Sequence, residues 1–282
     1  MASSVKGEFD RYYALCYSGH IMKNDKVENF IKFLGTAGAR FVVSTQLRAS
    51  GGIWICLNNV NILVDPGPGS LVRVLNSKPK LNPAHLNAIY VSHRHIDHCN
   101  DASIMIEAMT EGGTKKRGSL LIPYDALYQE TVIFPHTMNY LPAPPIILKE
   151  GEQYPINGIN LITPLRHKHP VETYGCILTD GKIKIGYIAD TAYFPELEKA
   201  YECDIVIMNV VLLEPRPAVQ HLSLPDAELL ITHLKPKVTL LTHFGMHLLR
   251  SKPWELTRAL EEKTKLKVIA ASDGLSFDLN QL

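Results

Sequence analysis

One short motif constrains this chain more than any other feature. Three histidines and an aspartate fall within six residues, at His93, His95, Asp97 and His98. The motif follows an apolar run at 86–91 that predicts a strand, and it precedes a predicted helix. Imidazole nitrogens and carboxylate oxygens are donors suited to Zn, Mn or Fe. The motif therefore indicates a metal site where a strand ends.

The spacing within the motif indicates two sites. If the strand ends near Ser92, His93 and His95 project to one side, and the following turn brings Asp97 and His98 round to a second point. One segment would then begin two adjacent metal sites. The alternative is a histidine-rich surface loop that binds metal adventitiously, and the flanking strand and helix disfavour it.

Further donors stand where later apolar runs stop. The candidates are His167, His169, Asp190, His221 and His243. Because a core would place apolar residues at such positions, their recurrence favours metal ligands over packing. The spacing alone does not decide between His167 and His169.

Two aspartates have separate expected roles. Asp190 is the natural bridge, since one carboxylate can give an oxygen to each of two cations and offset their repulsion. The alternative is a cap for a helix near Pro195. Asp65 ends an apolar run and precedes Pro66-Gly67, so it either orients a metal ligand or caps the next turn.

The order of predicted elements indicates an α/β (α+β) fold. Strands come first and helices are interleaved in each half, which favours two sheets packed face to face and covered by helices. At 282 residues with 46% hydrophobic content, the chain can bury a sizeable core in one domain. We expect that domain at 30–282, preceded by a mixed, polar N-terminal extension at 1–29.

Composition excludes several partners. The counts of Lys+Arg (29) and Asp+Glu (28) give a net charge of +1, so no basic field favours nucleic acid. Five scattered cysteines without a Cys-x-x-Cys pair argue against a disulfide framework and favour a reducing cytoplasm. No apolar run approaches the ~18 residues of a membrane span, and the first 29 residues lack a secretion pattern. We therefore expect a cytoplasmic protein with no membrane partner.

From residue 30 onward, the donor pattern resembles the metallo-β-lactamase superfamily. The matching segments are His93-x-His95-x-Asp97-His98, a later histidine, Asp190-Thr191 and Leu241-Thr242-His243. The segments at 33–38, 63–65, 169–175 and 221–223 resemble the ribonuclease Z and PhnP-like phosphodiesterase branch of that superfamily.

The resemblance implies a four-layered αββα sandwich with the site at one sheet edge. It also implies two ligand sets, with Asp190 between them: His93, His95 and His169 on one metal, and Asp97, His98 and His243 on the other. The choice of His169 over His167 rests on this resemblance, because His169 stands before Tyr174-Gly175 as in the branch.

By the same match, His221 corresponds to a histidine that contacts the scissile phosphate and protonates the leaving group. The chain departs from ribonuclease Z at two places. Met208-Asn209-Val210-Val211 stands where that branch carries His-Glu-Ala-Thr, so the carboxylate that would support His221 is missing. The interval from His169 to Asp190 also leaves no room for a tRNA-grasping arm, which disfavours tRNA cleavage.

The resulting hypothesis is a phosphodiesterase with two divalent metal ions, Zn by preference and Mn or Fe as alternatives, acting through a metal-bridging hydroxide. Its substrate would be a small-molecule or nucleotide phosphodiester. The alternatives are a lactone or thioester hydrolase, a tRNA 3′-processing endonuclease and a non-catalytic metal-binding protein. The oligomeric state stays open, with a homodimer among the options.

Overall fold

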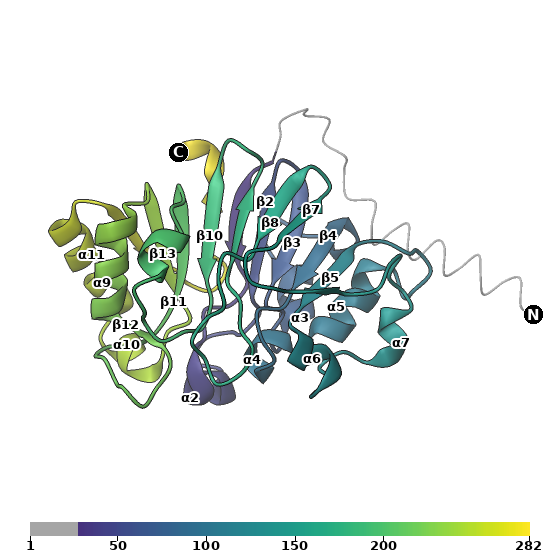
Figure 1. Cartoon of the computed structure of the whole chain (residues 1–282), viewed down its shortest axis with the longest axis horizontal. Helices are drawn as coiled ribbons and strands as arrows, with labels where there is room; N and C mark the ends of the chain where they lie inside the picture. The colour runs from purple at the N-terminus through teal and green to yellow at the C-terminus, as the bar shows by residue number, and fades with distance from the viewer. Residues whose placement is uncertain (1–27) are drawn as a thin grey trace, which may run out of the picture.

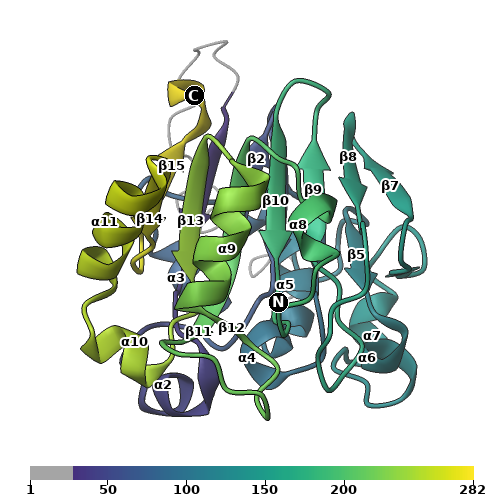
Figure 2. The same ribbon diagram turned by 60° about the vertical axis from the view of Figure 1, so that its left-hand side comes forward.

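Two sheets packed face to face form the centre of the computed structural model, which describes residues 28–282 (Figure 1). The expected extension at 1–29 therefore lies outside the described residues, except for its last two. Helices cover the outer face of each sheet, which gives the four layers of an αββα sandwich (Figures 1 and 2).

The first sheet contains seven strands. The strands at its β1 side are antiparallel, whereas β3, β4, β5 and β6 run parallel. In spatial order they are β15 (Ser276–Asp278), β1 (Phe30–Phe33), β2 (Ile53–Leu57), β3 (Val60–Val64), β4 (Leu86–Tyr90), β5 (Ser119–Ile122) and β6 (Ile146–Ile147).

The second sheet contains eight strands. β10, β11, β13 and β14 are parallel, and β7, β8, β9 and β10 pair antiparallel. Its main path is β14 (Lys267–Ala270), β13 (Val238–Thr242), β11 (Ile205–Leu212), β10 (Lys184–Ile188), β9 (Cys176–Thr179), β8 (Ile159–Ile162) and β7 (Gln153–Ile156), and β12 (Leu222–Ser223) pairs with β11.

The helices divide between the two outer faces and one end of the sandwich. On the side of the first sheet lie α3 (Ser70–Leu75), α5 (Ala102–Met109), α6 (Tyr124–Tyr128), α7 (Pro135–Met138) and the short turn η1 (Pro83–His85). On the side of the second lie α8 (Leu197–Ala200), α9 (Leu224–Leu234) and α11 (Pro253–Thr264). α2 (Ala39–Thr45), α4 (Ile96–Cys99) and α10 (Met246–Arg250) gather at one end, and η2 (Leu279–Gln281) closes the described chain.

Alternation along the strands builds three apolar layers. In β4, Ala88 and Tyr90 face the cluster between the sheets, while Ile89 packs with the helices of the first sheet. In β11, Ile207 faces inward and Met208 packs with the helices of the second sheet. Because both faces of these strands are covered, their sequences are continuous apolar runs.

Several elements differ from the sequence expectation. The apolar pattern predicts neither α2 nor β15, and it predicts a strand at 204–208 where β11 continues to Leu212. The helix predicted at 100–109, after the His93 motif, is observed as α5, and an additional short helix, α4, forms within the motif. The proline-rich segment at 134–145, which its sequence predicts as a loop, contains α7, which packs against α5. Among the described residues, no helix has both the length and the apolar character needed to cross a membrane.

Candidate metal centre

The candidate donors lie within or next to elements at the end of the sandwich where Figure 1 shows α2, α4 and α10. His93 and His95 lie on the turn after β4, and Asp97 and His98 lie in the first turn of α4. Parallel strands with their carboxyl ends at one edge commonly place ligand sites there. The sheet topology thus brings together residues that are far apart in the sequence.

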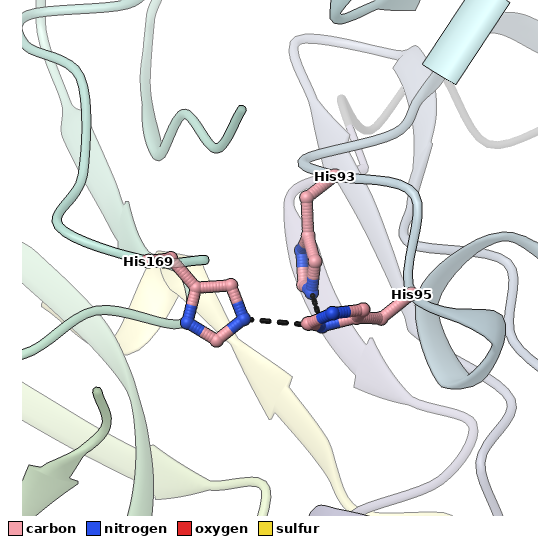
Figure 3. A group of neighbouring side chains, drawn as sticks. All are labelled: His93, His95 and His169. Carbon is pink, nitrogen blue, oxygen red and sulfur yellow. Dashed lines mark hydrogen bonds between the residues drawn. The ribbon is translucent and has the colours of Figure 1, made fainter. Parts of the chain in front are cut away.

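Three histidines form the first donor cluster, and Figure 3 shows their rings pointing toward one another. His93 Nε2 lies 3.0 Å from His95 Nδ1, and His169 Nε2 lies 3.1 Å from the same atom. At a Zn–N distance of about 2.0–2.1 Å, two nitrogens bound to one ion lie roughly 3 Å apart. The three nitrogens are therefore spaced as ligands of one cation.

Asp97, His98 and His243 form the second donor cluster. His98 Nε2 lies 3.0 Å from His243 Nε2, and Asp97 Oδ2 lies 3.4 Å from that His243 nitrogen and 3.7 Å from the His98 nitrogen. One carboxylate and two imidazoles converge on one point, as a second divalent cation requires.

The buried carboxylate of Asp190 lies between the two clusters. Its Oδ2 is 3.9 Å from His93 Nε2, in the first cluster, and 3.6 Å from His98 Nε2, in the second. Its Oδ1 accepts a hydrogen bond from Asn209 Nδ2 at 2.9 Å. Asp190 Oδ2 therefore approaches both clusters, and Oδ1 also lies 3.5 Å from His243 Nδ1, in the second cluster. The bridging role of Asp190 stays a prediction.

The outer ring nitrogens of three histidines have hydrogen-bond acceptors. His98 Nδ1 donates to Asp65 Oδ2 at 2.8 Å, and His169 Nδ1 donates to the carbonyl oxygen of Gln220 at 3.0 Å. His93 Nδ1 lies 2.9 Å from Ser92 Oγ. Such contacts orient metal-binding imidazoles and leave the inner nitrogen for the cation. The donor set therefore fits a pair of metal ions.

Asp65 is the centre of a buried hydrogen-bond network. Besides His98, its carboxylate accepts from the Ser92 backbone at 2.6 Å, from Ser92 Oγ at 2.7 Å and from the hydroxyl of Tyr187 at 2.6 Å. Asp65 therefore contacts one histidine of the second cluster directly and one of the first cluster through Ser92.

Tyr187 and Asn209 extend this network to Asp190. Asn209 Nδ2 donates both to the Tyr187 hydroxyl, at 3.0 Å, and to Asp190 Oδ1. Sequence reasoning missed both residues. Asn209 could have been found from the sequence, since it is the only amide side chain within the apolar run of β11. A buried polar side chain needs a hydrogen-bond partner, so its position there indicates a polar contact.

Burial and charge set the protonation of the cluster. Burial lowers the pKa of His93 and His95, and it lowers the pKa of His169 to about 4. Burial opposes ionisation of Asp190, but His243, His221 and His98 outweigh it, so the pKa of that carboxyl lies well below its usual value. His93, His95 and His169 are therefore neutral imidazoles near neutral pH, and the carboxyl group of Asp190 is ionised.

His98 is the exception among the histidines. Its burial favours the neutral ring, but the carboxylates of Asp97, Asp190 and Asp65 together raise the pKa of His98 well above its usual value. Without a cation, these carboxylates hold a proton on the ring. A metal ion would displace this proton and supply the positive charge that the carboxylates favour.

Backbone strain marks two of these positions. Asp65 has φ 51° and His243 has φ 61°, both in the left-handed region. A non-glycine residue held there costs on the order of 1–3 kcal/mol.

The segment at 35–38 packs against His243, since a Cβ on Gly38 would lie 1.9 Å from the His243 carbonyl oxygen.

The remaining sequence candidates have different surroundings. His167 is buried outside the donor clusters, with Nε2 2.7 Å from the hydroxyl of Tyr201, and burial lowers its pKa to about 3. His221 is partly exposed beside the centre, with Nδ1 3.5 Å from Asp190 Oδ2. The structure thus brings His169 and His221 close to Asp190, whereas His167 lies elsewhere.

Comparisons with known proteins show the family and the fold of this chain. Residues 60–244 match the family described as the beta-lactamase superfamily domain. An uncharacterized protein of Methanocaldococcus jannaschii is 31% identical over 256 residues, covering 88% of this chain and 94% of its own length.

Crystal structures with the same fold include three that cover 89% of this chain. The metallo-β-lactamase fold protein YhfI of Bacillus subtilis has a TM-score of 0.71 at 19% identity, with 99% of its own chain covered. The short form of human tRNase Z has a TM-score of 0.65 at 16% identity, with 99% covered. A diphosphatase of the PhnP family has a TM-score of 0.60 at 18% identity, with 97% covered.

Proposed function

We propose that this chain, which belongs to the metallo-β-lactamase superfamily, is a phosphodiesterase with two divalent metal ions held on either side of Asp190. The observation that carries the proposal is the pair of facing donor clusters with Asp190 Oδ2 close to both. We assign residues 30–282 to this hydrolase domain. The four free, buried cysteines among the described residues support a reducing compartment such as the cytoplasm.

The proposed ligand sets follow the two clusters. His93, His95 and His169 would hold one ion, while Asp97, His98 and His243 would hold the other. The nitrogen-rich first set favours Zn, and Mn or Fe are the alternatives. Two divalent ions held there would lower the pKa of bound water towards neutrality and shield charge on phosphoryl oxygens.

His221 would act as the general acid. Its ring lies beside the bridge, its Nδ1 has no hydrogen-bond partner, and its side chain is 19% exposed. Cleavage of a phosphodiester releases an alkoxide, and protonation makes this alkoxide a better leaving group. A histidine at the open side of the centre can supply that proton. Among the described residues, Asp190 is the carboxylate that pairs with the His221 ring.

The length of the chain between His169 and Asp190 bears on the size of the substrate. Between His169 and Asp190 the chain forms the β9–β10 hairpin, without a longer inserted arm. The names of the tRNase Z and the PhnP-family diphosphatase both indicate hydrolysis at phosphorus. Together these features favour a small-molecule or nucleotide phosphodiester over tRNA.

The direct test is to measure bound metal in the purified chain and assay bis-p-nitrophenyl phosphate and 2′,3′-cyclic nucleotides with and without chelator. We expect about two metal ions per chain and phosphodiester hydrolysis that chelation abolishes. Hydrolysis of lactones or thioesters, with none of any phosphodiester, would overturn the proposal.

His221→Ala separates catalysis from metal binding. The variant should keep both metal ions and lose about 100-fold or more in turnover, as expected for removal of a general acid. His85→Ala is a matched control, because His85 is exposed and lies before β4, at the opposite end of that strand from His93. Loss of a metal ion from His221→Ala would show that His221 is a ligand.

A further inference from the structure

A second cavity lies apart from the metal centre. It measures about 280 Å³ and lies among β1, the C-terminal end of α3 and the turn before β15. Lys32, Arg73, Asn76 and Lys78 line it, and none of the metal-centre donors does. We call it the Lys32–Arg73 cavity.

Lys32 brings a buried cation to this cavity. Its neighbours Ile31 and Phe33 face the core between the sheets, so Lys32 faces the opposite side of β1, where it is 5% exposed. Its Nζ donates to the carbonyl oxygens of Lys78 at 2.8 Å and Gly274 at 2.6 Å. An ammonium group has three protons, so one donor is left over.

Arg73 brings a second cation close to the first. Its Nε donates to the Leu34 carbonyl oxygen at 2.9 Å, which leaves four guanidinium protons for other acceptors. Burial lowers the pKa of Lys32, and the Arg73 charge adds to that effect. The two like charges therefore repel each other across the cavity.

Among residues 28–282, no carboxylate neutralises the charges of Lys32 and Arg73. Neither Lys32 nor Arg73 forms an ion pair there, and the same holds for Lys78. Asp273 precedes Gly274, but its two oxygens accept hydrogen bonds from Thr36 and from the Ala49 backbone. Lys32 is buried and Arg73 is half-buried, so an external anion would offset both the cost of burying the Lys32 charge and the repulsion between the two cations.

We propose that the Lys32–Arg73 cavity binds a small oxyanion, either free phosphate or the phosphate group of a small ester. The five unused donors of the two cations match an acceptor with several oxygens, and the planar guanidinium favours two-point contact with phosphate. The cavity is near the lower end of the usual size range of ligand pockets, about 300–1,000 Å³, which suits a small anion.

Crystals of the metal-loaded protein soaked in selenate give the position of the anion. Anomalous density is expected within hydrogen-bonding distance of Lys32 Nζ and the Arg73 guanidinium, separate from any selenate at the metal centre. Titration calorimetry with inorganic phosphate and with a nucleoside monophosphate then distinguishes free anion from ester. Selenate that binds at the metal centre alone would overturn the proposal.

Charge variants complete the test. Lys32→Gln keeps donors for the two carbonyl oxygens but removes the charge, and Asn76→Asp adds a negative charge at the exposed rim without altering the core. Each should weaken phosphate binding at this cavity by at least about tenfold. Asn160→Asp, an exposed position on β8, is the matched control and should bind as the unmodified chain does. Equal affinity in all four proteins would refute the site.

Discussion

The hydroxyl of Tyr187 lies between two groups on which the metal centre depends. It donates to Asp65, which orients His98, and it accepts from Asn209, which holds Asp190. Tyr187→Phe should therefore weaken metal binding by roughly 10–100-fold, the usual effect of losing a partner behind a ligand, while the ring still fills its space. Competition with a chromogenic chelator measures this affinity.

Tyr154→Phe provides the control for that experiment. The Tyr154 hydroxyl accepts from the Lys149 backbone and donates to the Ile147 carbonyl oxygen, away from the donor clusters. Both variants lose one hydroxyl, but only Tyr187→Phe should change metal affinity. If both variants bind metal as tightly as the unmodified chain, the hydroxyl of Tyr187 does not position the centre.

His167 and His169 form a second matched pair, two residues apart in one loop. His169 Nε2 faces His95, so His169→Gln should lose about one metal ion per chain. His167 contacts Tyr201 instead, so His167→Gln should keep both ions and lower the free energy of unfolding by about 1–3 kcal/mol, the cost of leaving a buried partner unsatisfied. Elemental analysis and urea unfolding measure the two effects. The reverse pattern would make His167 the ligand.

The sequence could predict the donors but only some of their partners. His93, Asp190 and His243 are recognisable because each polar residue follows an apolar run, and His98 because it belongs to the same short motif as His93. The acceptor for His169 is the carbonyl oxygen of Gln220, and every residue carries a carbonyl, so no sequence signal marks it. Which residue provides it depends on how the loop before β12 lies against the site.

At the scale of elements, the strongly patterned segments were the predictable ones. β4, β10 and β13 are the apolar runs that precede His93, Asp190 and His243 in the sequence, and their residues are mostly buried. α2 was missed because its sequence, ARFVVST, contains β-branched residues that favour helices weakly. β15 has three residues and pairs with β1 at the other end of the chain, a contact that local pattern cannot show.

The approach of Gly38 to His243 gives a prediction at this scale. A Cβ on Gly38 would lie 1.9 Å from the His243 carbonyl oxygen and 2.6 Å from its Nδ1. Gly38→Ala must therefore move the segment before α2 or the loop after β13, and it should weaken the site formed by Asp97, His98 and His243 by about tenfold or more. Stepwise metal titration resolves the two sites.

Gly112→Ala separates this effect from general destabilisation. Gly112 has φ 69° and open space around its Cβ position, so alanine there costs about 1 kcal/mol of stability through backbone strain alone. The variant should unfold at a lower urea concentration and bind both metals normally. Equal loss of metal affinity in Gly38→Ala and Gly112→Ala would mean that the contact with His243 has no specific role.

At the scale of the whole molecule, each donor cluster joins the two sheets. The first takes His93 and His95 from the turn after β4, in the first sheet, and His169 from the connection between β8 and β9, in the second. The second takes Asp97 and His98 from α4, and His243 from the end of β13. Each proposed ion would therefore link the sheets at this edge.

Removal of metal should then destabilise the whole fold. A ligand at about 100 times its Kd stabilises the folded state by about 2.7 kcal/mol, which corresponds to a Tm difference of roughly 5–10 °C for a domain of this size. Chelation should lower the Tm by at least that amount, and addition of metal should restore it. Differential scanning calorimetry measures both steps.

Hydrogen exchange locates the effect within the molecule. After chelation, backbone amides near His98 and His243 should lose protection first, because the carboxylates and imidazoles there are left without the cations that hold them together. The hairpin turns at 157–158 and 180–181 precede β8 and β10, at the opposite ends of these strands from His169 and Asp190, and their exchange should stay unchanged. An unchanged Tm, or protection lost equally at these hairpins, would contradict a role for metal in joining the two sheets at the edge where α4 and β13 meet.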